Sequence, residues 1–444
     1  MKSTIFSLGA TALVCASTVL GADLKCSLTK KCPKEAPCCG LYGDCGTGAF
    51  CLGGCDPRMS FSLESCMPAP TCKSQKYSFN NLDKVADISK YLGDPKKSDW
   101  VAQGEPLVSD GALLLTMPPR SVGTVLSSTA YMWYGSVKAK IKTSRGAGVV
   151  TGFILFSDVK DEIDYEWVGT ELEVAQTNYY FQGIPNYDNS KNISLSNTYD
   201  NWHTYEIQWT PDEITWLVDG QKGRTKKRSE TWNATANQWN FPQTPSRVQL
   251  SLWPGGAETN PKGTVDWAGG KIDWNNHEDI KKHGFYYAMV ESVEVSCMNS
   301  PNAPGTSKGS GYWYTDYRGT NDTVRDGDKR TTLKSLAGSG IDMDAGGSDA
   351  SSSTSGGSAS SPAQTGASAP APQVPGGSLV GPGADGRVGS DGSAPAPPAA
   401  DCNSKTFVQT CGQQPKSLAA RAAPSSLAGG ALAVVAALVA VAAL

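Results

Sequence analysis

The sequence predicts an all-β protein whose main domain is an antiparallel β-sandwich. Runs of aromatic and β-branched residues recur between turn signals, as at 202–209 and 214–220. Their spacing fits one sandwich domain over residues 75–298, a normal size for this architecture. Two segments of different character flank it, a cysteine-dense module at 23–72 and a Ser/Gly/Pro-rich stretch at 299–411.

Both ends of the chain carry patterns typical of the secretory pathway. Residues 1–21 join a basic start, an apolar run and small residues, which predicts a secretory signal peptide. Residues 412–444 join small residues, a polar spacer and an apolar tail, which predicts a glycosylphosphatidylinositol (GPI) anchor signal cut at Gly412, Ser417 or Ala419. A transmembrane helix is the alternative, but no Lys or Arg follows the tail. We therefore expect a secreted protein anchored to the outer leaflet of the plasma membrane.

The composition of residues 299–411 predicts a disordered stalk. Such a stretch buries too little apolar surface to offset the entropy of ordering. In a secreted protein it is typical of an O-glycosylated spacer. The N-glycosylation acceptors are Asn192, Asn233 and Asn321.

The 13 cysteines predict disulfides, because secreted proteins fold in an oxidising compartment. Nine lie between Cys26 and Cys72, and Cys297 stands alone, so one N-terminal cysteine is expected to pair with Cys297. Zinc is the alternative, but the three histidines show no ligand spacing, and we predict no metal and no cofactor. A net charge of −3 gives no reason to expect nucleic acid.

The segment 161–167 carries the strongest functional pattern. Glu162, Asp164 and Glu166 alternate with Ile163 and Tyr165, which puts the three acids on one face of a strand. The apolar run before this segment and the polar turn between them predict a hairpin. Because crowded carboxylates raise one another's pKa, the pattern indicates chemistry that needs one ionised and one protonated carboxyl group.

Retaining glycoside chemistry uses two carboxyl groups about 5–5.5 Å apart, one as nucleophile and one as acid/base. Strand residues four apart lie about 13 Å apart, so the Glu162 and Glu166 side chains must lean together or the strand must curve. Asp164 between them would tune both pKa values. Local spacing alone leaves the two glutamate roles interchangeable. The alternatives are an exposed acidic edge strand and a metal-binding loop.

Four segments carry a family resemblance that spans about residues 75–298. Residues 161–167 resemble the E-x-D-x-E signature of glycoside hydrolase family 16, retaining enzymes with a β-jelly-roll fold. Residues 176–180, 252–256 and 265–270 resemble its Crh branch, the fungal cell-wall transglycosylases that join chitin to β-glucan. The resemblance implies that Glu162 is the nucleophile, Asp164 the helper and Glu166 the acid/base.

Aromatic and amide side chains near these segments are candidates for sugar binding, since sugar rings stack on aromatic planes. Aromatic residues of a β-sandwich more often belong to the core, which is the alternative reading of each. The stacking candidates are Trp167, Tyr179, Trp253 and Trp267, and the hydrogen-bonding candidates are Gln176 and Asn178.

Residues 38–51 resemble the hevein-like chitin-binding modules of carbohydrate-binding family 18. The pairs that the resemblance implies are Cys26–Cys39, Cys32–Cys45 and Cys38–Cys51, with Cys55, Cys66 and Cys72 supplying a further bridge and the link to Cys297. The family grips sugar with a serine and three aromatics, but this chain keeps only the aromatics Tyr42 and Phe50, and Gly40 and Asp44 fill the other positions. A stapled structural cap is as good an interpretation as a weak chitin site.

Together these features predict a retaining transglycosylase with a chitin donor and a β-glucan acceptor that cross-links the cell wall. A retaining hydrolase of chitin or β-glucan is the alternative within the same chemistry. A non-catalytic wall lectin or structural mannoprotein is the alternative of another class, and the intact acidic pattern argues against it.

Overall fold

The structure is a computed structural model that describes residues 24–347. The predicted signal peptide at 1–21, the later part of the predicted stalk and the predicted anchor signal at 412–444 lie outside these residues. Within the described range, no helix is both long and apolar enough to cross a bilayer.

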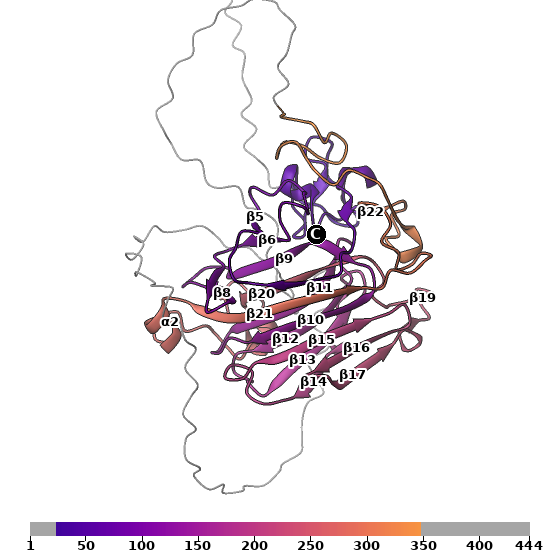
Figure 1. Cartoon of the computed structure of the whole chain (residues 1–444). Coiled ribbons are helices and arrows are strands. Elements are labelled where there is room, and N and C mark those ends of the chain that lie inside the picture. Colours follow the sequence, from indigo (N-terminus) through magenta and orange to yellow (C-terminus); the bar gives the residue numbers. More distant parts are fainter. Residues whose placement is uncertain (1–23, 348–444) are drawn as a thin grey trace, which may run out of the picture. The chain divides into compact units, whose positions relative to one another are not determined.

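Two eight-stranded sheets form the main domain, which confirms the predicted all-β class (Figure 1). In both sheets the paired strands are antiparallel except β5 and β6. The first sheet has the order β17 (Gln221–Lys227), β16 (Glu213–Val218), β15 (His203–Trp209), β10 (Gly135–Lys142), β21 (Tyr286–Cys297), β8 (Ala112–Met117) and β7 (Leu107–Ser109), with β4 (Gln75–Ser78) also paired to β21. The second has the order β14 (Lys191–Ser194), β13 (Val174–Tyr180), β12 (Glu162–Val168), β11 (Val149–Ser157), β20 (Ser246–Pro254), β9 (Thr124–Met132), β6 (Trp100–Gln103) and β5 (Val85–Asp87).

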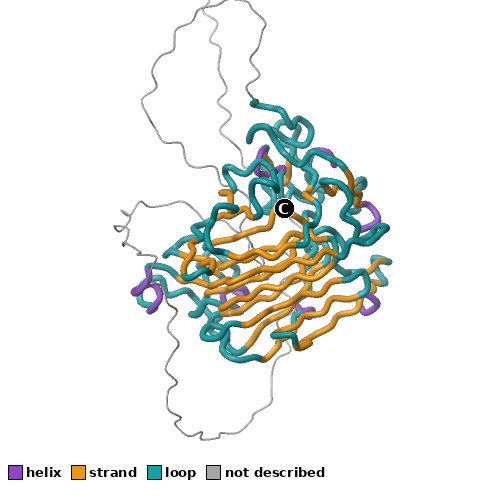
Figure 2. The backbone as a smooth tube through the Cα atoms, in the orientation of Figure 1, coloured by secondary structure: helices purple, strands orange, loops and turns teal. Residues whose placement is uncertain are grey.

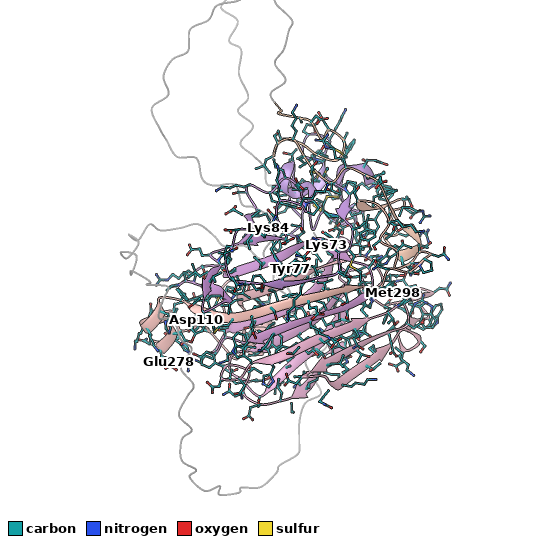
Figure 3. The ribbon with its side chains drawn as sticks, viewed as in Figure 1. Lys73, Tyr77, Lys84, Asp110, Glu278 and Met298 are labelled. Carbon is teal, nitrogen blue, oxygen red and sulfur yellow. A yellow bond between two sulfur atoms is a disulfide. The ribbon has the colours of Figure 1, made fainter. Side chains whose placement is uncertain are left out.

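The sheets pack face to face as a β-jelly-roll, and the chain passes repeatedly from one to the other (Figure 2). One continuous apolar core takes side chains from both sheets. Tyr77 of β4, labelled in Figure 3, meets Trp100 of β6 edge-on at 5.2 Å. Each such buried side chain contributes about 1.5–3 kcal/mol of hydrophobic stabilisation.

Short elements complete the fold. Helix α2 (Glu278–His283) ends at Gly284, which has a φ of 82°. Other short elements are α1 (Lys262–Trp267), β18 (Trp232–Asn233), β19 (Gln238–Trp239) and the 3₁₀ turns η3 (Tyr187–Asn189), η4 (Arg228–Glu230) and η5 (Asn321–Thr323).

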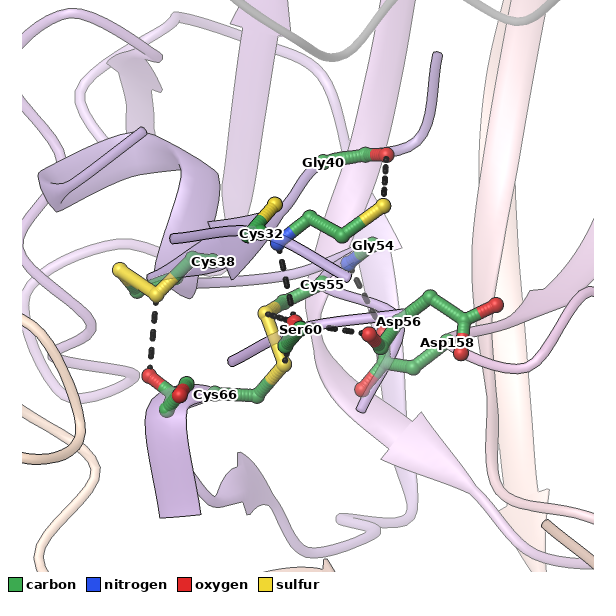
Figure 4. Close-up of a disulfide and its surroundings, with 12 residues drawn as sticks. Cys32, Cys38, Gly40, Gly54, Cys55, Asp56, Ser60, Cys66 and Asp158 are labelled. Carbon is green, nitrogen blue, oxygen red and sulfur yellow. Dashed lines mark hydrogen bonds between the residues drawn. A yellow bond between two sulfur atoms is a disulfide. The ribbon is translucent and has the colours of Figure 1, made fainter. Parts of the chain in front are cut away.

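The N-terminal module is held by disulfides and very short elements. The structure pairs Cys26–Cys39, Cys32–Cys45, Cys38–Cys51, Cys55–Cys66 and Cys72–Cys297, so the first three pairs are those implied by the resemblance. Its elements are β1 (Cys38–Cys39), β2 (Cys45–Gly46), η1 (Gly48–Cys51), η2 (Leu63–Ser65) and β3 (Ala69–Pro70). Figure 4 shows the Cys55–Cys66 bridge beside Asp158 of the sandwich.

The predicted start of the stalk at residue 299 is wrong. Residues 299–347 are folded: β22 (Gly311–Tyr314) pairs with β23 (Val324–Gly327) on one side and with β3 on the other. Tyr312, Val324 and Leu333 are almost fully buried. A few well-placed apolar side chains therefore order a segment whose average composition is that of a linker.

Candidate active site

The acidic strand is β12, and it lies inside the second sheet. It pairs with β11 along the predicted hairpin and with β13 on its other side. The turn between β11 and β12 closes through the bond from the Ser157 backbone N–H to the Asp161 carbonyl at 2.9 Å. An exposed acidic edge strand, the alternative drawn from the sequence, is therefore wrong.

Asp161 fixes the start of β12. Its Oδ1 accepts from the backbone N–H of Gln182 at 2.9 Å. Its Oδ2 accepts from the backbone N–H of Gln243 at 2.9 Å and from the Thr244 hydroxyl at 2.7 Å. Although burial raises its pKa, these donors favour the ionised form. This fully buried carboxyl group thus ties two loops to the residue that precedes Glu162.

The strand register places the three acids in three rows across the sheet, because directly opposed residues of antiparallel strands share a face. The first row is Arg247, Phe156, Glu162 and Tyr180. The second row is Gln249, Ile154, Asp164 and Asn178. The third row is Ser251, Gly152, Glu166 and Gln176. We call this the acid face; the opposite face of β12 points into the core.

The acids are buried without full hydrogen bonding. Glu162, Asp164 and Glu166 are 4%, 1% and 6% exposed. Oε1 of each glutamate and both carboxylate oxygens of Asp164 have no hydrogen-bond partner within the described residues. Native proteins normally satisfy buried polar atoms, so such a cluster indicates a site that binds a polar ligand.

Burial and mutual repulsion shift the protonation of all three acids. Burial, and then the charges of Asp164 and Glu166, hold the pKa of Glu162 well above its usual range. Burial and the charge of Asp164 do the same to the pKa of Glu166. Burial raises the pKa of Asp164 to about 7, against the lowering influence of Glu162, Arg224 and the Asn178 backbone N–H. Near neutral pH this set can hold protonated and ionised carboxyl groups side by side.

Four of the predicted sugar-binding residues adjoin the acids. Gln176 and Asn178 lie opposite Glu166 and Asp164 on β13. Trp253 follows the acid-face positions of β20, and its indole lowers the pKa of Glu166 in part. The Trp267 indole is roughly parallel to that of Trp253, at 6.0 Å and 24°, and donates to Gln176 Oε1 at 2.8 Å.

Trp167 and Tyr179 lie on the other face, so the expectation that they bind sugar beside the acids is wrong. Trp167 stacks on Tyr165 at 5.7 Å and meets Tyr205 of the first sheet at 4.5 Å. Tyr179 lies opposite Ile163 in the same core. Its ring borders a cavity of about 520 Å³ with Phe181, Ile184 and Trp232, among others.

Sequence reasoning missed several acid-face residues. Tyr180 lies opposite Glu162, and its pKa is raised by burial and by the charges of the acids. Alternation from Gln176 and Asn178 could have found it. A Cβ on Gly152 would lie 2.6 Å from Ser251 Oγ, so this glycine keeps space open beside Glu166. Arg247 and Ser251 come from a strand about 90 residues away, and no local pattern marks them.

The remaining predicted sites lie elsewhere in the fold. Tyr42 and Phe50 of the module are both partly buried, and Phe50 packs against the cluster that holds Leu52. Among the N-glycosylation acceptors, Asn192 is exposed on β14, whereas Asn233 and Asn321 are partly buried.

Buried glutamates at positions 162 and 166 of one strand in a jelly-roll are the arrangement expected of an enzyme that acts on glycosidic bonds. Residues 94–269 match the family model described as glycosyl hydrolases family 16. The chain is 62% identical to Crh-like protein 3 of Botryotinia fuckeliana (strain B05.10) over 79% of this chain and 77% of that protein. It is 53% identical to Crh-like protein 2 of Aspergillus fumigatus (strain ATCC MYA-4609 / CBS 101355 / FGSC A1100 / Af293) over 77% of this chain and 78% of that protein.

The chain belongs to the Crh-like proteins of glycosyl hydrolase family 16, and it is an enzyme of the glycosidase and transglycosylase type. Among solved structures it is similar to a Crh5 transglycosylase in complex with NAG, with 28% identity and a TM-score of 0.49 over 61% of this chain and 99% of that one.

Proposed function

We propose that this protein is a retaining transglycosylase that cleaves chitin and transfers the cut end to β-glucan, cross-linking the cell wall. The observation that carries the proposal is the set of three buried acids on β12, in which four carboxylate oxygens lack a hydrogen-bond partner within the described residues. The membership among Crh-like proteins supports transfer as the outcome.

In the first step the Glu162 carboxylate attacks the anomeric carbon of the donor, and Glu166 protonates the departing sugar oxygen. The pKa of both glutamates is raised, so the assignment of Glu166 as the acid follows the family resemblance, and the raised pKa means that a protonated carboxyl group is at hand near neutral pH. The charge of Asp164, which lies between them on β12, raises the pKa of both glutamates. In the second step Glu166 takes the proton of an incoming hydroxyl, which displaces Glu162 from the sugar.

The nature of the second nucleophile separates transfer from hydrolysis. An acceptor sugar gives a hybrid polymer, and water gives a shortened donor. The aromatic pair Trp253 and Trp267 supports glycan binding next to Glu166, because apolar faces of sugars stack on indoles and exclude water there. We assign the role of glycan contact to this pair and to Gln176 and Asn178.

The proposal includes a secreted, membrane-anchored location with the signal at 1–21 and the anchor signal at 412–444. The five disulfides among residues 26–297 support the secreted part of it, because such bridges persist in oxidising compartments.

The test incubates the purified protein with chitin oligomers and a labelled laminarin oligosaccharide and resolves the products by mass. Hybrid products that disappear in Glu162→Gln support the proposal. Shortened chitin without hybrids would replace transfer by hydrolysis. Full activity in Glu162→Gln would refute the assignment of the nucleophile. Trp209→Phe is a matched control, since Trp209 is fully buried in the core, away from the acid face.

A further inference from the structure

The cysteine-rich module is fastened to the catalytic hairpin itself. The backbone N–H of Gly54 donates to Asp158 Oδ1 at 2.8 Å, and Asp158 lies in the turn between β11 and β12. The Tyr131 hydroxyl donates to the same oxygen at 2.6 Å, so module, turn and β9 share one buried carboxyl group. Figure 4 shows Gly54 and Asp158 at this junction.

At this junction the module backbone lies close against Arg247 and Tyr131. A Cβ on Gly53 would lie 2.5 Å from Arg247 Nη1 and 3.1 Å from the Tyr131 hydroxyl oxygen. A Cβ on Gly54 would lie 3.0 Å from Arg247 Nη2. The glycines therefore let the module backbone approach an arginine that begins the first row of the acid face.

A second contact brings the module onto the acid face. Leu41 packs on Ile154 and Phe156, two buried residues of β11. The register sets Phe156 directly opposite Glu162 and Ile154 directly opposite Asp164. Leu41 thus contacts Phe156, the residue of β11 that neighbours the proposed nucleophile Glu162 in the first row.

Tyr42 follows Leu41 and brings an unused polar group to this place. Its hydroxyl oxygen is buried and has no hydrogen-bond partner within the described residues. The charge of Arg247 acts on it, opposing in part the rise of its pKa that burial causes. A buried phenol without a partner costs stability unless a ligand completes its hydrogen bond.

We propose that the module forms one wall of the active site, in which Tyr42 and Leu41 contact the glycan of the donor on the Glu162 side. Leu41 offers an apolar contact to a sugar face, and the Tyr42 hydroxyl offers one hydrogen bond to a sugar hydroxyl or N-acetyl group. This assigns Tyr42 to donor binding by the enzyme, not to an independent chitin-binding surface. The inference rests on the proposed function for the identity of the donor.

The test measures the dissociation constant of a soluble chitin oligomer in the Glu162→Gln background, where turnover cannot interfere. Adding Tyr42→Phe removes one hydroxyl and is expected to weaken binding about fivefold, the size of one neutral hydrogen bond. Leu41→Ala is expected to weaken it as well. Leu28→Ala, at a module position that is 68% exposed, is the control and should leave binding unchanged.

Steady-state kinetics of the single variants complete the test. Tyr42→Phe should raise KM for the chitin donor about fivefold and leave KM for the laminarin acceptor within twofold. Unchanged donor binding would overturn the inference, as would loss of retention on insoluble chitin with unchanged kinetics. If wild-type protein forms no hybrid products but Tyr42→Phe still weakens oligomer binding, the proposed transfer is refuted. The contact between the module and the donor glycan is then supported.

Discussion

The Cys72–Cys297 bridge should contribute more stability than any other disulfide of the described part. It joins residues 225 apart, and the sequence has no cysteine between them. The whole loop is therefore free in an unfolded chain that lacks this bridge. Chain-entropy reasoning gives about 5.4 kcal/mol for closing a loop of this length, and about 2.8 kcal/mol for the 11-residue loop of Cys55–Cys66.

The perturbation is the double variant Cys72→Ala/Cys297→Ala, with Cys55→Ala/Cys66→Ala as the matched comparison. Urea unfolding followed by tryptophan fluorescence gives the free energy of unfolding of each. The first variant should lose about 2.7 kcal/mol more than the second, since only the loop length enters this difference. Equal losses, or a larger loss in the short-loop variant, would refute the reasoning from loop closure.

The other predictions concern the acid face. Asp164→Asn removes a charge that raises the pKa of both glutamates, so both limbs of the pH–rate profile should move to lower pH; an unmoved profile would contradict the coupling. Gly152→Ala should lower kcat on the order of tenfold while the melting temperature changes little, because the new methyl group crowds Ser251 beside Glu166; kcat equal to wild type would show that the space is not needed. Trp253→Phe should raise KM for glycans, whereas Trp167→Phe should lower the melting temperature and leave KM unchanged; the reverse pattern would exchange their roles.

Local alternation was enough to predict the hairpin, its face of acids and its apolar face. The same alternation places Trp167 with Ile163 and Tyr165, so a strict reading of the two-residue period would have assigned it to the core. Tyr179 is the same case one strand further on, because its register with Ile163 follows from the pairing of Asn178 with Asp164.

Pairings between residues far apart in the chain could not be predicted from the sequence. Arg247 joins the first row only because β20 pairs with β11, and Leu41 reaches Phe156 only because the module docks on the turn at Asp158. Composition also hid the folded segment after residue 298, since a handful of apolar residues such as Leu333 supply its buried surface. Averages over a window cannot detect a few residues that matter by position.

Ionisation of Asp164 on the acid face should lower the free energy of unfolding, so this effect should depend on pH. The pKa of Asp164 is raised from 3.8 to about 7, so the folded state holds this proton more tightly than the unfolded state. A carboxyl group with a raised pKa destabilises the fold as the pH rises from the unfolded value through the folded one. At 1.36 kcal/mol per pKa unit, the full cost above pH 7 is about 4 kcal/mol as an upper limit.

Asp164→Asn should therefore be more stable than wild type at pH 8 and show little gain at pH 4, measured by thermal unfolding at both values. A gain of equal size at the two pH values would mean that packing, not ionisation, sets the difference. A loss at pH 8 would mean that the Asp164 charge stabilises the strand that carries it.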